Sequence, residues 1–157
     1  MNNYPYRLNV GFLINAPVGT YRDFTFDQPA MELADDLHGD DIHCTVRASR
    51  VQQGILAEAE CSCKTELECI RCLEPFEAEL NAHFEELFYF HWLRESKDAE
   101  EFLPESGYLD LGEIIREYLV MEVPYCPICK EDCKGLCPEC GENLNLHPHT
   151  HPELEEE

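Results

Sequence analysis

The chain has 157 residues, 44% of them hydrophobic, which is enough to bury the core of one medium-sized domain with a small appendage. Its formal net charge is −22, from 33 acidic residues against 11 lysines and arginines, and no basic surface for gripping nucleic-acid phosphates is visible in the sequence. An acidic surface suits a basic protein partner, although solubility explains a charge of this size equally well.

The N-terminal segment and the lengths of the apolar runs predict the cellular compartment of the protein. Residues 1–7 contain no basic run followed by a long apolar core, so we expect no secretory signal. No apolar run is long enough to span a membrane, and residues 88–93 form only a short, interrupted one. We therefore predict a cytoplasmic chain without a membrane partner. Its 10 cysteines would stay reduced there, so that clustered cysteines indicate metal ligands.

Residues 1 to about 92 alternate between apolar and polar positions, as strands do. The candidate strands are 7–14, 42–51, 55–61, 65–69 and 76–84. The turn at 52–54 would fold the second of these onto the third as a hairpin. The segment 76–84 also fits a helix, and that alternative stays open.

One helix is expected after a charged stretch. Residues 94–107 are charged and contain a proline and a glycine, which predicts a loop. The segment Asp110-Leu-Gly-Glu113 has the spacing of a capping box, an apolar face of period 3.6 follows, and Pro124 ends the helix. We predict an α+β fold, with an antiparallel sheet or partial barrel, one capped helix and a C-terminal zinc ribbon or knuckle.

Three Cys-x-x-Cys pairs, one of them Cys126-Pro-Ile-Cys129, have the local spacing that tetrahedral zinc requires, and two of them are the predicted centres of zinc sites. The first is Cys69-Ile-Arg-Cys72, at the end of a predicted strand. A thioredoxin-like redox role is the alternative for this pair, but Leu73-Glu-Pro75 blocks the helix that such a role needs. The second pair is Cys137-Pro-Glu-Cys140, followed by a glycine that permits the positive φ of a knuckle turn.

Each pair needs two more ligands. His149 and His151 would complete the set of Cys137 and Cys140, with His147 as the alternative ligand and a solvated histidine-rich tail as the alternative interpretation.

Cys129 and Cys133 would complete the set of Cys69 and Cys72, which would staple distant parts of the chain together. Cys126 is also available, and we expect it to be a spare thiol. Three further cysteines, Cys44, Cys61 and Cys63, lack complementary spacing and are expected to be small core residues or free thiols.

At these residues the chain resembles a known family. The segment Cys69-Ile-Arg-Cys72-Leu-Glu-Pro-Phe76 looks like the Cys-x-Arg-Cys-Leu-Glu-Pro segment of the YceD proteins, the large-ribosomal-RNA-subunit accumulation proteins of bacteria and plastids. The run from Asp110 to Pro124 is similar to the family's acidic helix. Residues 131–145 match its C-terminal signature closely. The resemblance covers residues from about 54 to 151.

The resemblance implies a role in the accumulation of 23S ribosomal RNA and in assembly of the large ribosomal subunit. It carries over Cys69, Cys72, Cys129 and Cys133 as one cysteine set, and Cys137 with Cys140 as the knuckle. Many members have a Cys-x-Cys where this chain has His149-Thr-His151. Histidine can also bind zinc, so that two structural zinc ions are expected.

We therefore expect a non-enzymatic assembly factor with three parts, a core domain at 1–124, a zinc-binding ribbon at 125–151 and an acidic tail at 152–157. Its expected partner is a basic large-subunit ribosomal protein or a pre-ribosomal particle, with weak or indirect RNA contact. The sequence does not fix the oligomeric state.

Two alternatives come from other functional classes. A nucleic-acid-binding zinc ribbon would need basic residues near the knuckles, where only Arg71, Lys130 and Lys134 occur. A zinc enzyme is less well supported, because both predicted ligand sets are closed and no His-Glu-x-x-His helix exists. His83 and His91 are expected to be surface residues.

Overall fold

The computed structural model describes residues 4–93 and 101–151. The chain starts with the short strand β1 (Arg7–Asn9) and the one-turn helix α1 (Gly11–Ile14). Four long strands follow, β2 (Tyr21–Ala34), β3 (Leu37–Arg50), β4 (Gly54–Glu68) and β5 (Pro75–Tyr89). The short 3₁₀ helix η1 (His91–Leu93), the strand β6 (Tyr108–Asp110) and the helix α2 (Gly112–Met121) complete the fold.

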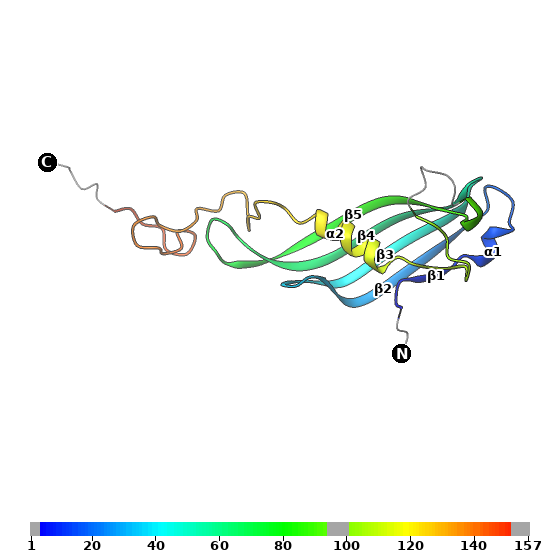
Figure 1. Cartoon of the computed structure of the whole chain (residues 1–157). Helices are drawn as coiled ribbons and strands as arrows, with labels where there is room; N and C mark the ends of the chain where they lie inside the picture. Colours follow the sequence, from blue (N-terminus) through cyan, green and yellow to red (C-terminus); the bar gives the residue numbers. More distant parts are fainter. Residues whose placement is uncertain (1–3, 94–100, 152–157) are drawn as a thin grey trace. The chain divides into compact units, whose positions relative to one another are not determined.

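The four long strands form one antiparallel sheet in the order β2-β3-β4-β5 (Figure 1). Strict alternation of burial along β4 explains why this segment is a strand, because its odd-numbered residues from Ile55 to Leu67 are buried and its even-numbered residues face outward. The inner face of β3 shows the same period, from Ile42 to Ala48. One face of the sheet is therefore apolar and the other polar.

The apolar face is covered by α2 and by the small ribbon of β1 and β6, which pair antiparallel (Figure 1). The helix buries Ile115 and Leu119, one turn apart, as its apolar period predicts. The ring of Tyr118 stacks on Phe84 of β5 with the ring centres 4.6 Å apart. These contacts close the core of the sheet domain.

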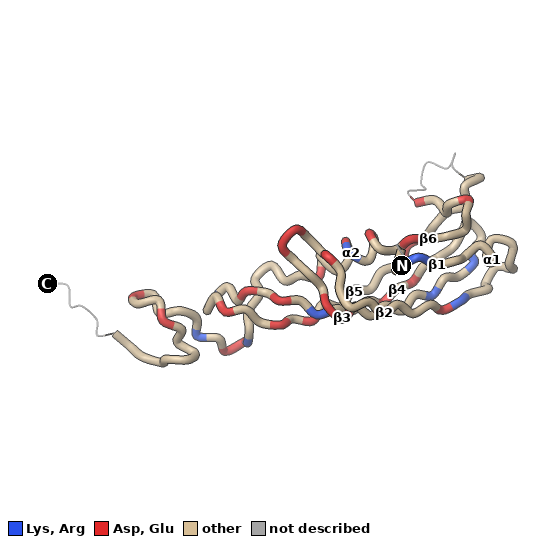
Figure 2. Tube along the Cα trace, turned by 90° about the horizontal axis from the view of Figure 1, so that it is seen from below, with Lys and Arg blue, Asp and Glu red and all other residues tan. Residues whose placement is uncertain are grey.

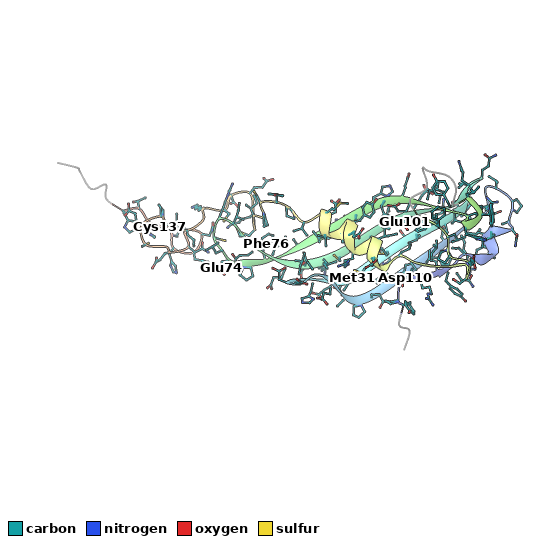
Figure 3. All side chains as sticks on the ribbon, viewed as in Figure 1. Met31, Glu74, Phe76, Glu101, Asp110 and Cys137 are labelled. Carbon is teal, nitrogen blue, oxygen red and sulfur yellow. A yellow bond between two sulfur atoms is a disulfide. The ribbon has the colours of Figure 1, made fainter. Side chains whose placement is uncertain are left out.

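The chain divides into two compact units. One comprises residues 1–65 and 79–122, and the other comprises residues 66–78 together with 123–157. The tip of the β4–β5 hairpin thus belongs to the same unit as the cysteine-rich segment. Phe76, at the start of β5, packs there against buried cysteines (Figure 3). The predicted acidic tail, 152–157, lies outside the described residues, as does the first half of the loop predicted at 94–107.

Several predicted elements are confirmed and others differ. The hairpin of 42–51 with 55–61 is present, and 76–84 is strand rather than helix. The predicted strand 7–14 ends at Asn9, because the chain turns there into α1. The strand β2 was not predicted.

The predicted capping box of α2 is wrong by one position. The cap residue is Leu111 and makes no side-chain cap, while Asp110 Oδ1 accepts a 3.0 Å hydrogen bond from the N–H of Gly112. The helix ends at Met121, before Pro124.

Two of the three cysteines expected to be core residues or free thiols are joined in a disulfide. Cys44 and Cys61 lie opposite each other in the β3–β4 register and form the bond, whereas Cys63 is free, and all three are buried. Their spacing of 17 residues gave no sign of this contact, because the hairpin register alone brings them together. Within residues 4–93 and 101–151, no helix has the length and apolar character needed to cross a membrane.

Candidate metal centres

The turn between β4 and β5 is a knuckle built around Cys69 and Cys72. The N–H of Cys69 donates to the carbonyl of Glu74 at 3.0 Å, and the N–H of Leu73 donates to the carbonyl of Cys69 at 2.8 Å. Leu73 has a φ of 61°, a left-handed conformation that is uncommon for a leucine. This tight turn presents both thiols of the pair to the same side.

The second Cys-x-x-Cys pair folds into the same turn. The N–H of Cys137 donates to the carbonyl of Glu142 at 2.7 Å, and the N–H of Gly141 donates to the carbonyl of Cys137 at 2.8 Å. Gly141 has a φ of 77° and occupies the position that Leu73 holds in the first turn. The two pairs share this hydrogen-bond pattern, in which the carbonyl of a glutamate five residues after the first cysteine is the acceptor in both turns.

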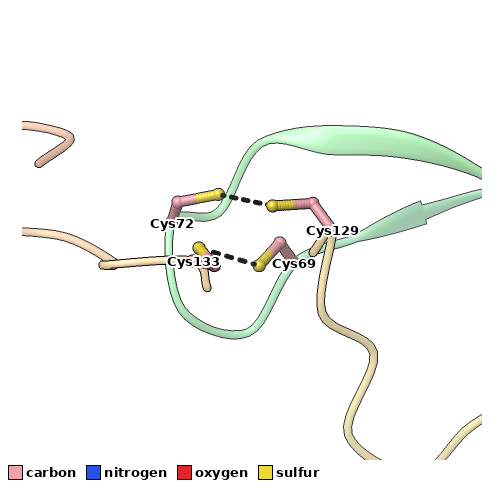
Figure 4. A group of neighbouring side chains, drawn as sticks. All are labelled: Cys69, Cys72, Cys129 and Cys133. Atoms are coloured by element: carbon pink, nitrogen blue, oxygen red, sulfur yellow. Dashed lines mark hydrogen bonds between the residues drawn. The ribbon is translucent and has the colours of Figure 1, made fainter. Parts of the chain in front are cut away.

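The first knuckle brings its thiols to two cysteines of the C-terminal segment. The Sγ atoms of Cys69 and Cys133 are 3.8 Å apart, as are those of Cys72 and Cys129 (Figure 4). All four sulfur atoms lie within 4.8 Å of one another, and three of the four residues are buried. The group could therefore hold a metal ion. We call it the four-cysteine group.

Arg71 ties the two halves of the four-cysteine group together. Its guanidinium donates to the carbonyl oxygens of Glu131 and Cys133, both at 3.2 Å, and its own carbonyl accepts from the N–H of Leu136 at 3.1 Å. Gly135 approaches so closely that a Cβ there would lie 3.1 Å from the Arg71 carbonyl oxygen. The arginine inside the first Cys-x-x-Cys pair thus serves as a clamp on the backbone that carries Cys133.

The backbone around both knuckles favours thiolates. Burial opposes ionisation of Cys69, but backbone N–H groups, that of Cys72 foremost, outweigh it and lower the pKa of the Cys69 thiol to about 6. The N–H of Cys140 leads those that lower the pKa of Cys137 to about 6 as well. Burial and the neighbouring thiols raise the pKa of Cys129 to about 12. Each knuckle therefore holds one thiol that is readily ionised, which is the form that binds metal.

The second group consists of Cys137, Cys140, His149 and His151, whose ligand atoms also lie within 4.8 Å of one another. Nε2 of His149 is 3.2 Å from Sγ of Cys140 and 3.1 Å from Nε2 of His151. Cys137 is buried and His149 half-buried, whereas Cys140 and His151 are exposed. This group could also hold a metal ion, in a more open setting. We call it the mixed group.

Each histidine of the mixed group has a partner on the ring nitrogen that points away from the group. Nδ1 of His149 lies 2.8 Å from the carbonyl oxygen of His147, and Nδ1 of His151 lies 3.4 Å from a carboxylate oxygen of Glu139. A proton held on Nδ1 leaves Nε2 with a free lone pair directed at the other donors. Histidines that bind metals in proteins are oriented in this way.

The remaining candidate ligands lie outside both groups. Cys126 is an exposed free thiol, and His147 contributes its carbonyl oxygen rather than its ring. Two supporting residues, Arg71 and Asn145, were not recognised from the sequence as parts of the site. Both lie inside the segments quoted for the family resemblance. The Arg71 side chain donates to the backbone carbonyl of Cys133, and the Asn145 side chain donates to its sulfur.

Comparison with known proteins identifies the family. The family described as "Large ribosomal RNA subunit accumulation protein YceD" matches residues 57–157, which is more than half of the chain. The chain belongs to the YceD family. The match includes every donor of both groups.

Matched relatives occur in mycobacteria and in a plant. A protein of Mycobacterium tuberculosis is 32% identical over 116 residues, covering 70% of this chain and 55% of the relative, and one of Mycobacterium leprae is 29% identical over 121 residues, covering 74% and 56%. The chain thus spans about half the length of these relatives. A chloroplastic YCED homolog of Arabidopsis thaliana, named for large ribosomal RNA subunit accumulation, is 39% identical over 49 residues, which are 31% of this chain and 15% of that protein. No solved structure matches the chain.

Proposed function

We propose that this YceD protein is a non-enzymatic, cytoplasmic factor that supports accumulation of 23S rRNA and assembly of the large ribosomal subunit. The observation that carries this proposal is the family match over residues 57–157, because it spans both knuckles and all eight donor side chains. The name of the chloroplastic relative supports the same role.

We propose further that each group binds one structural zinc ion. Zinc–sulfur bonds of about 2.3 Å arranged as a tetrahedron put sulfur atoms about 3.8 Å apart. The two separations in the four-cysteine group, each 3.8 Å, fit that spacing. Four thiols, or two thiols with two imidazoles, are donor sets typical of structural zinc. Zinc supplies a cross-link there, and its binding energy adds to the folding energy.

The donor sets favour a structural role over catalysis. Each set offers four ligands, which leaves a tetrahedral ion without an open position for substrate. A nucleic-acid-binding zinc ribbon remains the alternative function, because Lys130 and Lys134 are exposed next to Cys129 and Cys133. Such binding would weaken steeply as salt rises.

The acidic surface supports a basic partner, either a large-subunit ribosomal protein or a pre-ribosomal particle. Outward positions on β4 and β5 carry Glu58, Glu60, Glu79 and Glu85, of which Glu60 lies 4.0 Å from His83. Opposite charges would speed encounter with a basic protein even where they add little affinity. In this proposal the core at 1–124 presents that surface, the ribbon at 125–151 adds specificity, and 152–157 is an acidic tail.

The test combines depletion with affinity purification. Depleting the protein should lower large-subunit particles and 23S rRNA relative to small-subunit material, and unchanged subunit ratios would contradict the assembly role. Purification of the tagged chain from native lysate, with and without nuclease, addresses the partner. A basic ribosomal protein retained after nuclease supports direct protein binding, whereas its loss points to the RNA-binding alternative.

A further inference from the structure

An unusual set of contacts involves the arginines of the N-terminal part. Residues 1–60 contain four arginines and no lysine, and each arginine lies over an aromatic ring. The ring centre nearest to each guanidinium carbon is that of Tyr4 at 3.9 Å for Arg7, Phe12 at 5.5 Å for Arg22, Tyr21 at 4.4 Å for Arg47, and Phe90 at 4.4 Å for Arg50. Figure 2 shows basic segments at the end of this unit that carries α1.

Two of the four arginines have their charge available. Arg47 is held by Asp23 through hydrogen bonds of 2.7 and 3.1 Å, and Arg50 donates to the carbonyl of Val51. Arg7 and Arg22, by contrast, form neither an ion pair nor a side-chain hydrogen bond with any residue in the described part of the chain. Their positive charge therefore remains free to meet an anion.

Each of these two arginines lies near a second ring as well. Arg7 is also 5.5 Å from the ring centre of Tyr108, and Arg22 is 5.6 Å from that of Phe24. We call these residues the arginine–aromatic surface, which comprises Arg7 with Tyr4 and Tyr108, and Arg22 with Phe12 and Phe24.

Three of the four rings of this surface are exposed to solvent, and Phe24 is half-buried. Tyr4 is 45% exposed, Phe12 46% and Tyr108 43%. The three exposed rings come from the segment before β1, from α1 and from β6, which the β1–β6 pairing and the short path from β1 into α1 hold together. A ligand with flat, apolar faces could stack on these rings without disturbing the core.

We propose that the arginine–aromatic surface binds single-stranded RNA. Unpaired bases have flat faces that stack on exposed aromatic rings, and the phosphates between them attract guanidinium groups. Holding each arginine against a ring beforehand lowers the cost of ordering it on binding. The choice of RNA as occupant rests on the proposed role in 23S rRNA accumulation, and the surface lies apart from both zinc knuckles in the sequence.

The charge distribution explains why the strand must be single. A duplex hides its base faces and presents closely spaced phosphates, which an acidic protein with two free arginines would repel. A single strand has a lower charge density and offers its bases. Neutralising two phosphates of a single strand predicts a slope of about −1.4 in a plot of log affinity against log salt.

The experiment measures RNA binding by the full, zinc-loaded chain. The probe is a fluorescently labelled strand of about 12 nucleotides, alone and annealed to its complement. We expect the single strand to bind more tightly than the duplex. The double variant Arg7→Gln/Arg22→Gln should lose at least about tenfold in affinity and flatten the salt slope, and Phe12→Ala should lose about tenfold through stacking alone.

The control is Lys64→Gln, which removes one positive charge from a lysine of β4 that lies 3.6 Å from Asp41 and outside this surface. Equal losses for the control and the double variant would overturn the proposal, as would equal binding of duplex and single strand. If the double variant loses a basic ribosomal protein and keeps its RNA affinity, the surface is a protein contact and the RNA proposal is wrong. An RNA affinity that stays unchanged in the double variant would also overturn the RNA proposal, and normal subunit ratios restored by that variant would leave the assembly role intact.

Discussion

The side-chain amide of Asn145 donates a hydrogen bond of 3.3 Å to the sulfur of Cys133. Asn145 lies in the loop between Cys140 and His149, which belong to the mixed group, whereas Cys133 belongs to the four-cysteine group. The side-chain oxygen Oδ1 of Asn145 also accepts a hydrogen bond from the backbone N–H of Lys134 at 2.9 Å. One side chain therefore links the loop that completes one group to a donor of the other. Its amide also leads the contacts that lower the pKa of the Cys133 thiol.

The first prediction concerns this link. Asn145→Ala should weaken metal retention by the four-cysteine group about tenfold or more, because a hydrogen bond that orients a ligand sulfur is lost. Asn145→Asp keeps the acceptor for Lys134 and loses the donor to sulfur, so it should behave like the alanine variant. Chelator-driven zinc release measures the effect. Asn81→Ala, an exposed asparagine of β5, is the control, and equal release from all three variants would contradict the prediction.

The second prediction assigns one metal to each group. Cys72→Ser should remove one of two zinc ions and lower the free energy of unfolding by about 4 kcal/mol, the entropy of closing the 57-residue loop to Cys129. His149→Ala/His151→Ala should release only the other ion.

Elemental analysis of the protein without a histidine tag, together with urea unfolding, checks both results. Cys126→Ser removes an exposed thiol outside both groups and should change neither metal content nor stability. Full metal content in Cys72→Ser would show that the four-cysteine group is misassigned.

The third prediction uses the equivalent positions of the two knuckles. Gly141→Ala should cost about 1 kcal/mol, because φ is 77° and nothing within 4 Å touches the added Cβ. Gly135→Ala should cost more, since its Cβ also crowds the carbonyl of Arg71. Leu73→Gly relieves the same strain and should change stability by less than about 0.5 kcal/mol. Chemical denaturation ranks the three variants, and a large loss in Leu73→Gly would mean that its exposed side chain has a contact role.

The fourth prediction is a loss of stability at alkaline pH. Burial, together with the charge of Asp40, raises the pKa of the Cys63 thiol to about 11, from 9.0 in an unfolded chain. The protonated thiol therefore contributes its full share of the free energy of unfolding below pH 9. This share is lost as the pH rises through 11, at up to about 1.4 kcal/mol per pH unit. The free energy of unfolding, measured from pH 8 to 11, should fall less steeply with pH in Cys63→Ala than in the wild type. Parallel curves would show that the buried thiol does not control this loss.

The sequence predicted what depends on local spacing. Alternation along 55–61 and 76–84 marked two strands of the sheet, and the Cys-x-x-Cys spacing marked both turns. The strand β2 was missed because Pro29 interrupts its alternation, and pairing with β3 overrides that weak local preference.

Contacts between distant residues could not be predicted in the same way. The bond between Cys44 and Cys61 depends on strand register, and the stacking of Arg22 on Phe12 depends on how α1 folds back. The net charge of −22 likewise gave no indication that Arg7 and Arg22 lie on the surface without an ion pair to any of the described residues. Spacing along a chain predicts a turn, but it does not predict which side chains meet once strands pair.

The two halves of the four-cysteine group also differ in when they are made. During translation Cys72 leaves the ribosome before β5, β6 and α2 exist, and Cys129 follows them. The β4–β5 hairpin needs only neighbouring residues and can form within microseconds, whereas the last thiols arrive seconds later at ordinary rates of synthesis. A nascent chain therefore carries an incomplete, two-thiol knuckle throughout synthesis of the core. Tight zinc binding would then occur only in chains whose synthesis has passed Cys133, after β5, β6 and α2 have been made.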